Sequence, residues 1–325
     1  MKDFEVIDVH VHLARTVEEE SNSWIVPGRR ACDRWATPEK VISYMDSKGI
    51  SKIVFLALIP RQFRGPLIEK AKLMELNEDQ HQRRRKEIAE QIASSMREFN
   101  EWSCEVGRRF PRISPFICVS NDLGNAKAMV QEVVLRANQG AKGVKLHPGM
   151  FCFFPDDEEF WPMYEKCQQL GLPILADSGP WPHSHVLTTH PLLFQMPQPH
   201  ISYGEPRNFA RVLEAFPQLT LILAHLGSAW WDERVELAEK YPNVYFDTAQ
   251  GFSAPDRIPV VPHRSLAEED AVRVMRKIGI ERIMFGTDSP AIAPQPQLEQ
   301  LLRLPLSKEE KRMILAENAK RILPI

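Results

Sequence analysis

Phe4-Glu5-Val6-Ile7-Asp8-Val9-His10-Val11-His12 has the pattern of a buried β-strand that ends in two histidines. Side chains two positions apart on a strand point to the same face, so His10 and His12 project together. Two neutral imidazoles side by side are a common beginning of a divalent metal site. Near the other end of the chain, a second short strand leads into Phe285-Gly286-Thr287-Asp288-Ser289-Pro290 and delivers a carboxylate, Asp288. The two ends of the sequence therefore predict one polar site built from strand termini.

The size and charge of the chain limit the classes of protein to which it can belong. Its 325 residues are 43% hydrophobic, and no break in composition marks a second domain, so a single α/β domain over residues 1–325 is expected. The net charge of −2 provides no field that would attract nucleic acid or an anionic membrane. No apolar run reaches the length of about 18 residues that spans a membrane. Five widely spaced cysteines and a charged first segment predict a cytoplasmic protein with reduced thiols.

Short apolar or β-branched runs recur along the chain, with helical patterns between them. Several runs are almost continuously apolar, as strands buried on both faces are. The predicted strands are Val6–His12, Lys52–Leu58, Ile113–Val119, Gly143–His147, Pro173–Asp177, Leu221–His225, Val244–Thr248 and Arg282–Asp288. The predicted helices are Pro38–Lys48, about Glu69–Arg109, Ala126–Gln139, Phe160–Leu170, Arg207–Ala215, Trp231–Lys240, Leu266–Ile278 and a last helix opened by a capping box at Ser307–Glu310. Eight strand-then-helix units predict an α/β fold of the (β/α)8 or TIM barrel type.

Four long insertions follow predicted strands and would lie at the carboxyl-terminal face of the barrel, where barrel enzymes hold substrate. They are Leu13–Ala36, the segment after Leu58, Ser178–Pro206 and Ala249–Ser265. Arginines in these loops are candidates for binding a substrate carboxylate, because a guanidinium binds a carboxylate with two parallel hydrogen bonds. These arginines are Arg29, Arg30, Arg61, Arg64, Arg207, Arg257 and Arg264.

Polar side chains collect where six of the predicted strands end. They are His10, His12, Lys145, His147, Asp177, His225, Asp247 and Asp288. A charged group at the end of a buried strand is costly unless it is paired or binds a metal. Because six strands share this feature, the sequence predicts a functional site at one end of the barrel.

Five segments resemble the amidohydrolase superfamily, in the branch that contains aminocarboxymuconate-semialdehyde decarboxylase and many metal-dependent hydrolases. They occur in the family's order and span nearly the whole chain: Ile7–His12, Gly143–Pro148, Leu223–Gly227, Val244–Thr248 and Phe285–Pro290. The resemblance implies that His10 and His12 bind a metal and that Asp288 completes the metal site while it shuttles protons. It also implies that His225 is either a second-metal ligand or the group that polarises a substrate carbonyl.

The fifth predicted strand departs from the family pattern. The branch commonly has a histidine ligand after a segment like Leu172–Ala176, whereas this chain has Asp177. If Asp177 is the ligand, two imidazoles and two carboxylates surround the ion, and this harder set shifts preference from zinc toward manganese. Alternatively, His183 or His185 reaches the site from the following loop, or the site is degraded. Zinc is the expected ion and manganese is the alternative.

Lys145 has two interpretations. In binuclear relatives, a lysine on the fourth strand is carboxylated and bridges two metals. The favoured interpretation is an ammonium that pairs with Asp177 or another carboxylate, or binds substrate, because a buried ammonium needs a counter-charge. Asp8 and Asp247 are expected to hold ligand imidazoles rather than to bind the ion themselves.

The expected activity is metal-dependent hydrolysis of an amide, ester or lactone in a small substrate, with or without a carboxylate. Asp288 would accept the proton of the attacking water and return it to the leaving group, while His225 or Lys145 stabilises the oxyanion. The second expectation is non-oxidative decarboxylation of an aromatic or muconate-like acid, which the same ligands would serve. The third is a metal-free binding barrel. No nucleic-acid or membrane partner is expected, and self-association is left open.

Overall fold

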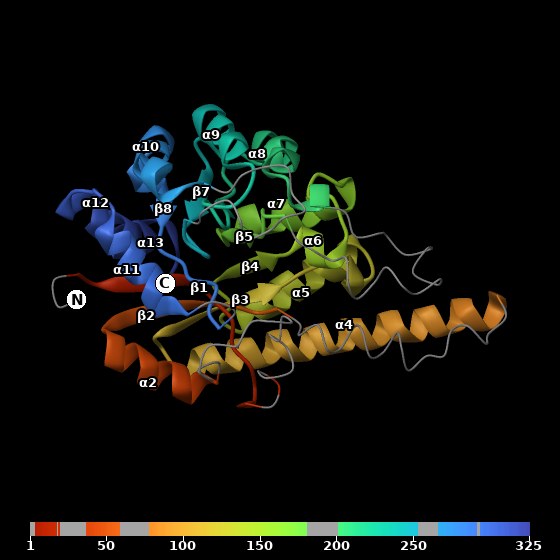
Figure 1. The fold of residues 1–325 in the computed structure, drawn as a ribbon. Helices are drawn as coiled ribbons and strands as arrows, with labels where there is room; N and C mark the ends of the chain where they lie inside the picture. The colour runs from red at the N-terminus through yellow and green to blue at the C-terminus, as the bar shows by residue number, and fades with distance from the viewer. Residues whose placement is uncertain are drawn as a thin grey trace.

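The chain forms a sheet of eight parallel strands in sequential order, each paired with the next. The computed structural model describes residues 4–17, 19, 37–58, 78–180, 201–252, 266–290 and 293–325. Its strands are β1 (Val6–Val11), β2 (Ile50–Leu56), β3 (Ile113–Cys118), β4 (Gly143–Leu146), β5 (Ile174–Ala176), β6 (Leu221–Leu223), β7 (Val244–Asp247) and β8 (Ile283–Met284) (Figure 1). All eight predicted strand positions are therefore confirmed.

The sheet closes on itself through backbone hydrogen bonds between β1 and the segment that follows β8. Val9 N donates to Phe285 O over 2.9 Å, and Asp288 N donates to His10 O over 2.8 Å. His12 N donates to Ser289 O over 2.7 Å. This closure makes the fold a TIM barrel, as the strand–helix alternation predicts, and it places Asp288 directly beside His10 and His12.

Each predicted strand ends later than the observed one, and in the candidate site the difference is largest at His225 and Asp288. The sequence pattern extends the sixth and eighth strands to His225 and Asp288, but β6 ends at Leu223 and β8 at Met284. Both His225 and Asp288 have a left-handed backbone conformation, with φ of 64°. An L-residue rarely adopts such a φ, and it turns the chain out of the extended geometry of a strand.

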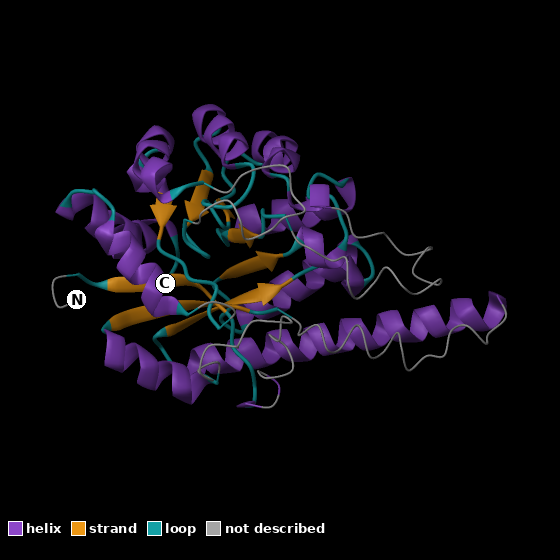
Figure 2. Ribbon diagram, in the orientation of Figure 1, coloured by secondary structure: helices purple, strands orange, loops and turns teal. Residues whose placement is uncertain are grey.

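Helices cover the outer face of the barrel (Figure 2). They are α2 (Pro38–Lys48), α4 (Glu78–Arg109), α5 (Ala126–Asn138), α6 (Pro148–Phe151), α7 (Trp161–Leu170), α8 (Ala210–Ala215), α9 (Trp231–Lys240), α10 (Glu268–Ile278), α11 (Pro294–Arg303), α12 (Lys308–Arg312) and α13 (Asn318–Ile322). The capping box at Ser307 and Glu310 is confirmed at the start of α12. Helix α4 is the longest of those described and extends past the barrel in Figure 1.

Alternation along each strand sorts side chains between the helices and the barrel interior. On β4, Val144 and Leu146 pack in the main core together with residues of the surrounding helices. Lys145 lies between them in sequence and therefore points to the opposite, interior face. The interior holds a second apolar cluster that includes Val54, Phe116 and Ile222.

Much of the predicted insertions lies outside the described residues, including His183 and His185 and six of the seven loop arginines. The seventh, Arg207, forms ion pairs with Glu233 and with Glu205, the latter at 3.2 Å. In the described ranges, no helix combines the length and the apolar character needed to cross a membrane.

Candidate metal centre

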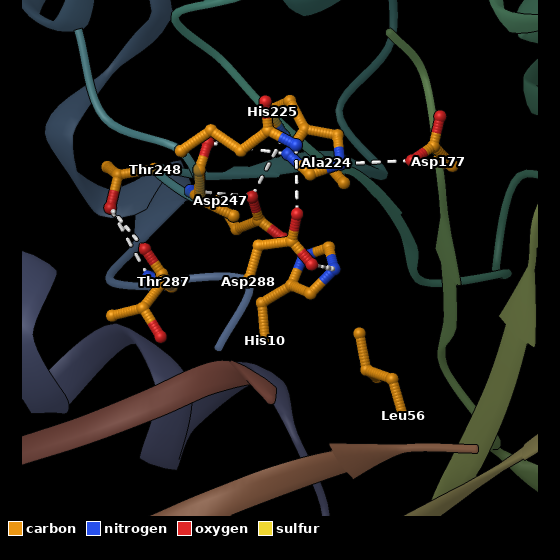
Figure 3. Close-up of polar contacts among 12 residues, drawn as sticks. His10, Leu56, Asp177, Ala224, His225, Asp247, Thr248, Thr287 and Asp288 are labelled. Atoms are coloured by element: carbon orange, nitrogen blue, oxygen red, sulfur yellow. Dashed lines mark hydrogen bonds and ion pairs between the residues drawn. The ribbon is translucent and has the colours of Figure 1, made fainter. Parts of the chain in front are cut away.

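The predicted site residues meet at the carboxyl-terminal ends of the strands (Figure 3). His10 is on β1, with His12 just after it, and Asp247 ends β7. Asp177, His225 and Asp288 follow β5, β6 and β8. All six side chains are buried. The barrel thus brings together groups that are up to 278 positions apart in sequence, from His10 to Asp288.

The tautomers of His10 and His12 are set by their neighbours. Nδ1 of His10 lies 2.8 Å from Asp247 Oδ2, and Nδ1 of His12 lies 2.9 Å from the carbonyl oxygen of Leu56. Both partners are acceptors, so each Nδ1 must carry the proton and donate it. When such a ring is neutral, its lone pair is on Nε2. Burial, aided by Lys145, lowers the pKa of His10 to about 4, which keeps this ring neutral.

The two Nε2 atoms face the carboxylate of Asp288. Asp288 Oδ1 lies 3.6 Å from Nε2 of His10 and 3.2 Å from Nε2 of His12. These three acceptor atoms all lie within 4.8 Å of one another. Lone pairs directed at one another are repulsive unless a cation lies among them, so the donor set fits a divalent metal ion.

A glycine allows the strands to approach this closely. A Cβ atom on Gly286 would lie 2.9 Å from Cβ of His10 and 3.3 Å from Cβ of Asp247. Real Cβ contacts are longer, so any side chain at this position would push β1 and β7 away from the segment that carries Asp288.

Asp288 is oriented by a residue that the sequence pattern does not single out. Nε2 of Gln250, just beyond β7, donates to Asp288 Oδ2 over 2.8 Å. The only sequence signal for Gln250 is a polar side chain three residues after Asp247, at the same end of the barrel.

Asp247 links two of the site histidines. Its Oδ2 accepts from His10 as described, and its Oδ1 accepts from the backbone N–H groups of His225 at 2.9 Å and Ala249 at 3.0 Å. The prediction that Asp247 holds a ligand imidazole therefore agrees with the geometry.

Asp8 differs from its prediction because it holds backbone rather than an imidazole. Its Oδ1 accepts from the backbone N–H groups of His10 at 3.1 Å and Thr287 at 3.0 Å. Its Oδ2 accepts from the Thr287 hydroxyl at 2.6 Å. Asp8 thus fixes the chain on both sides of the candidate metal centre.

Asp177 faces His225. Its Oδ2 lies 2.9 Å from Nε2 of His225, whose Nδ1 lies 3.3 Å from the carbonyl oxygen of Ala249. Burial alone would lower the pKa of His225, but the Asp177 carboxylate outweighs it and the net pKa is raised. Both ring nitrogens of His225 face acceptors, which fits an imidazolium. Among the described residues, the close group of possible ligands around Asp288 contains His10 and His12 but not Asp177.

His147 also faces Asp177 with a protonated nitrogen. Nδ1 of His147 accepts from the backbone N–H of Met150 over 3.2 Å, at the start of α6. Nδ1 therefore carries the lone pair and Nε2 carries the proton. Nε2 lies 3.5 Å from Asp177 Oδ2. His147 has the opposite tautomer to His10 and His12, so it is suited to stabilise a carboxylate and not to bind a metal.

Lys145 departs from its predicted pairing. Its ammonium is buried, and within the described part of the chain Nζ has no hydrogen-bond partner and no ion pair within 4.0 Å. Burial lowers the pKa of Lys145, against the opposing effect of Asp177, Asp247 and Asp288. The expected ion pair with Asp177 is not formed, because that carboxylate is turned to His225.

A comparison with models of protein families shows the family to which the chain belongs. The family model described as amidohydrolase matches residues 7–325. The chain belongs to this family. No functionally curated protein matches its sequence.

Solved structures resemble this amidohydrolase-family chain over nearly its whole length. An uncharacterised TIM-barrel protein from Bordetella bronchiseptica is 18% identical, with 98% of each chain covered and a TM-score of 0.68. A dihydroxybenzoic acid decarboxylase from Polaromonas, with bound manganese and an inhibitor, is 16% identical over 98% of this chain and 96% of the other, with a TM-score of 0.66. A probable 2-pyrone-4,6-dicarboxylic acid hydrolase from Acinetobacter baumannii is 14% identical over 98% and 99%, with a TM-score of 0.57. At these identities the structures establish the fold of the chain.

Proposed function

We propose that this chain is a divalent-metal-dependent enzyme that removes carbon dioxide from a small aromatic or unsaturated carboxylic acid without an oxidant. The observation that carries the metal dependence is the buried group of two imidazoles and one carboxylate formed by His10, His12 and Asp288, whose ligand atoms lie within 4.8 Å of one another. The choice of decarboxylation is supported by the decarboxylases that recur among the similar structures.

His10, His12 and Asp288 would hold the ion, and Asp177 is the proposed fourth ligand. Two neutral imidazoles and two carboxylates balance a 2+ charge, and this oxygen-rich set favours manganese over zinc. The manganese in the Polaromonas structure supports the same choice. When bound, the ion would supply the positive charge that anchors an anionic substrate and stabilises negative charge as it develops.

The residues around the ion supply acid–base chemistry. Loss of carbon dioxide from a carboxylate leaves an electron pair on carbon, and one proton must then be delivered to that carbon. We assign this delivery to Asp288, which would first take up one proton from solvent water and which Gln250 holds in place. His225, made cationic by Asp177, is a further positive group that would stabilise the developing charge. The buried amine of Lys145 would act in the same way in its protonated form.

Hydrolysis is the second candidate and is favoured by the likeness to the Acinetobacter hydrolase. In that reaction Asp288 would accept the proton of the attacking water, and His225 or Lys145 would stabilise the oxyanion. The metal-free binding barrel is disfavoured, because three buried acceptors that face one another without a cation would be costly.

The reaction class can be decided with manganese-loaded protein and a panel of hydroxybenzoates, muconate-like acids, lactones and amides, assayed in oxygen-18 water. Decarboxylation predicts carbon dioxide in equal amount to product, without solvent oxygen in the product. Hydrolysis predicts label in the new carboxylate, after correction for exchange. Turnover of lactones alone, with label and without carbon dioxide, would replace the first proposal by the second.

A further inference from the structure

Arg234 on α9 is a completely buried arginine beside the candidate centre. It is the largest of the fully buried side chains in the described residues. Within the same residues, no carboxylate lies within the 4.0 Å of an ion pair with its guanidinium. A buried charge without a counter-ion is destabilising unless hydrogen bonds replace its hydration. The position of those hydrogen bonds therefore indicates what this side chain does.

The guanidinium binds the backbone on both sides of the Asp177–His225 contact. Nη2 donates to the carbonyl oxygen of Ser178, to Ser178 Oγ at 3.1 Å and to the carbonyl oxygen of Ala224 at 3.4 Å. Ser178 Oγ in turn donates to the same Ala224 oxygen over 2.7 Å. Ser178 follows Asp177, and Ala224 precedes His225.

The other terminal nitrogen of the guanidinium, Nη1, binds the backbone near the start of the arginine's own helix. Nη1 of Arg234 donates to the carbonyl oxygen of Ala229 over 2.7 Å, in the turn that leads from His225 into α9. The planar fork thus spans three backbone segments at once, which the ammonium of a lysine cannot do with the same geometry. The segments that it joins are the end of β5, the end of β6 and the start of α9.

We propose that Arg234 and Ser178 form a positioning pair that sets the distance and orientation between Asp177 and His225. This role rests on the proposed function, in which Asp177 is a metal ligand and His225 a cationic group of the site. Arg234 touches neither substrate nor metal and acts through the two strand ends.

The positive charge of Arg234 also acts on Asp177. Burial lowers the pKa of Arg234 to about 10, so the guanidinium remains charged at neutral pH. This fixed positive charge attracts the Asp177 carboxylate.

The test measures manganese affinity of the full-length protein, together with thermal stability, for Ser178→Ala and Arg234→Lys. Ser178→Ala removes only one hydroxyl, so it keeps the proposal testable if the arginine variants do not fold. Each variant is expected to weaken manganese binding by about 10-fold, at the lower end of the effect of groups that orient metal ligands. Arg136→Lys is the matched control, because Arg136 is also buried but pairs with Glu132 on α5. It should lower stability and leave manganese affinity unchanged.

A double-mutant cycle separates positioning from a general structural role. If Arg234 and Ser178 act through Asp177, Ser178→Ala should have no further effect on residual manganese binding in an Asp177→Ala background. Equal manganese affinity of the wild type, Ser178→Ala and Arg234→Lys would overturn the proposal, as would full additivity with Asp177→Ala.

If the proposed function is wrong, the experiments give a result that differs from failure of the positioning role. If the wild-type protein binds neither manganese nor zinc, the metal assignment is wrong, and the positioning role is then tested by crystal structures of the wild type and Ser178→Ala. The role predicts a longer separation of Asp177 Oδ2 and His225 Nε2 in the variant than the 2.9 Å found here. An unchanged separation would reject it.

Discussion

Asp247 Oδ2 lies 2.8 Å from Nδ1 of His10, and this contact determines which nitrogen of His10 can bind a metal. Replacement by asparagine keeps the size of the side chain but lets its amide donate to Nδ1, which stabilises the wrong tautomer. Asp247→Asn should therefore fold and weaken manganese binding by roughly 10–100-fold. Titration calorimetry with manganese checks this. Unchanged affinity would mean that the tautomer of His10 does not matter for binding.

The first requirement of the proposed function is a bound ion. Protein purified without chelator should contain about one divalent ion per chain, with manganese or zinc as the ion. His10→Ala removes one of the three facing acceptors and should lose the ion while retaining the fold. Elemental analysis and circular dichroism measure the two properties. A wild-type protein with almost no metal, and a His10→Ala variant that behaves identically, would eliminate the metal centre.

Asp177 is proposed as a ligand although its carboxylate is turned to His225 in the structure. Asp177→Ala should weaken metal binding by at least about 10-fold. Asp177→His restores the imidazole that is common in the family and should bind metal with a preference shifted from manganese toward zinc. Competition between the two ions measures this shift.

The alternative ligands for this position, His183 and His185, lie outside the described residues. Alanine variants of these two histidines distinguish this alternative from the assignment of Asp177. If His183→Ala or His185→Ala releases the metal while Asp177→Ala retains it, the ligand comes from the loop after β5 and the assignment of Asp177 is wrong.

Asp288 is both a proposed ligand and the proposed proton carrier. Asp288→Asn preserves the hydrogen bond geometry with Gln250 only in part and cannot carry the proton, so kcat should fall by about 10²–10⁴-fold. Gln250→Leu removes the donor and keeps the carboxylate, and a smaller loss is expected. If Gln250→Leu and Asp288→Asn reduce kcat equally, the carboxylate acts only when Gln250 orients it.

Far from the centre, the capping box of α12 predicts a pH-dependent contribution to stability. Glu310 accepts from the backbone N–H of Ser307 and from Arg276, and these contacts, led by the arginine, lower the pKa of Glu310 to about 2. Because the pKa is lower in the folded state, the contribution is present above the unfolded value and is lost as the pH falls toward 2.

Glu310→Gln tests this contribution. It should cost about 0.5–1 kcal/mol of unfolding free energy at pH 7, the range of a helix cap and a surface ion pair, and almost nothing near pH 2. Glu309→Gln, one position earlier and on the surface, is the control. Denaturant titrations at both pH values give the comparison, and an equal cost at the two pH values would contradict the assignment.

The sequence predicts the barrel well because its signals are local. Continuous apolar runs, helix caps and the spacing of units each act within a few residues, and eight repeats make the pattern specific. Local patterns are less successful at strand ends. His225 and Asp288 continue apolar runs and so resemble strand residues, but their left-handed backbone turns them out of the strand toward the site.

The sequence by itself determined the fold and the set of polar side chains at the strand ends, because strand alternation places them on one face of a closed barrel. Only the tertiary structure decided what each of them can do. The contacts of His10 with Asp247 and of His12 with Leu56 leave metal-binding lone pairs, whereas Met150 makes His147 a donor. The roles of Gln250 and Arg234 also appear only there. These contacts join residues on different segments, and their partners are set by the register and closure of the barrel, which no local pattern of sequence encodes.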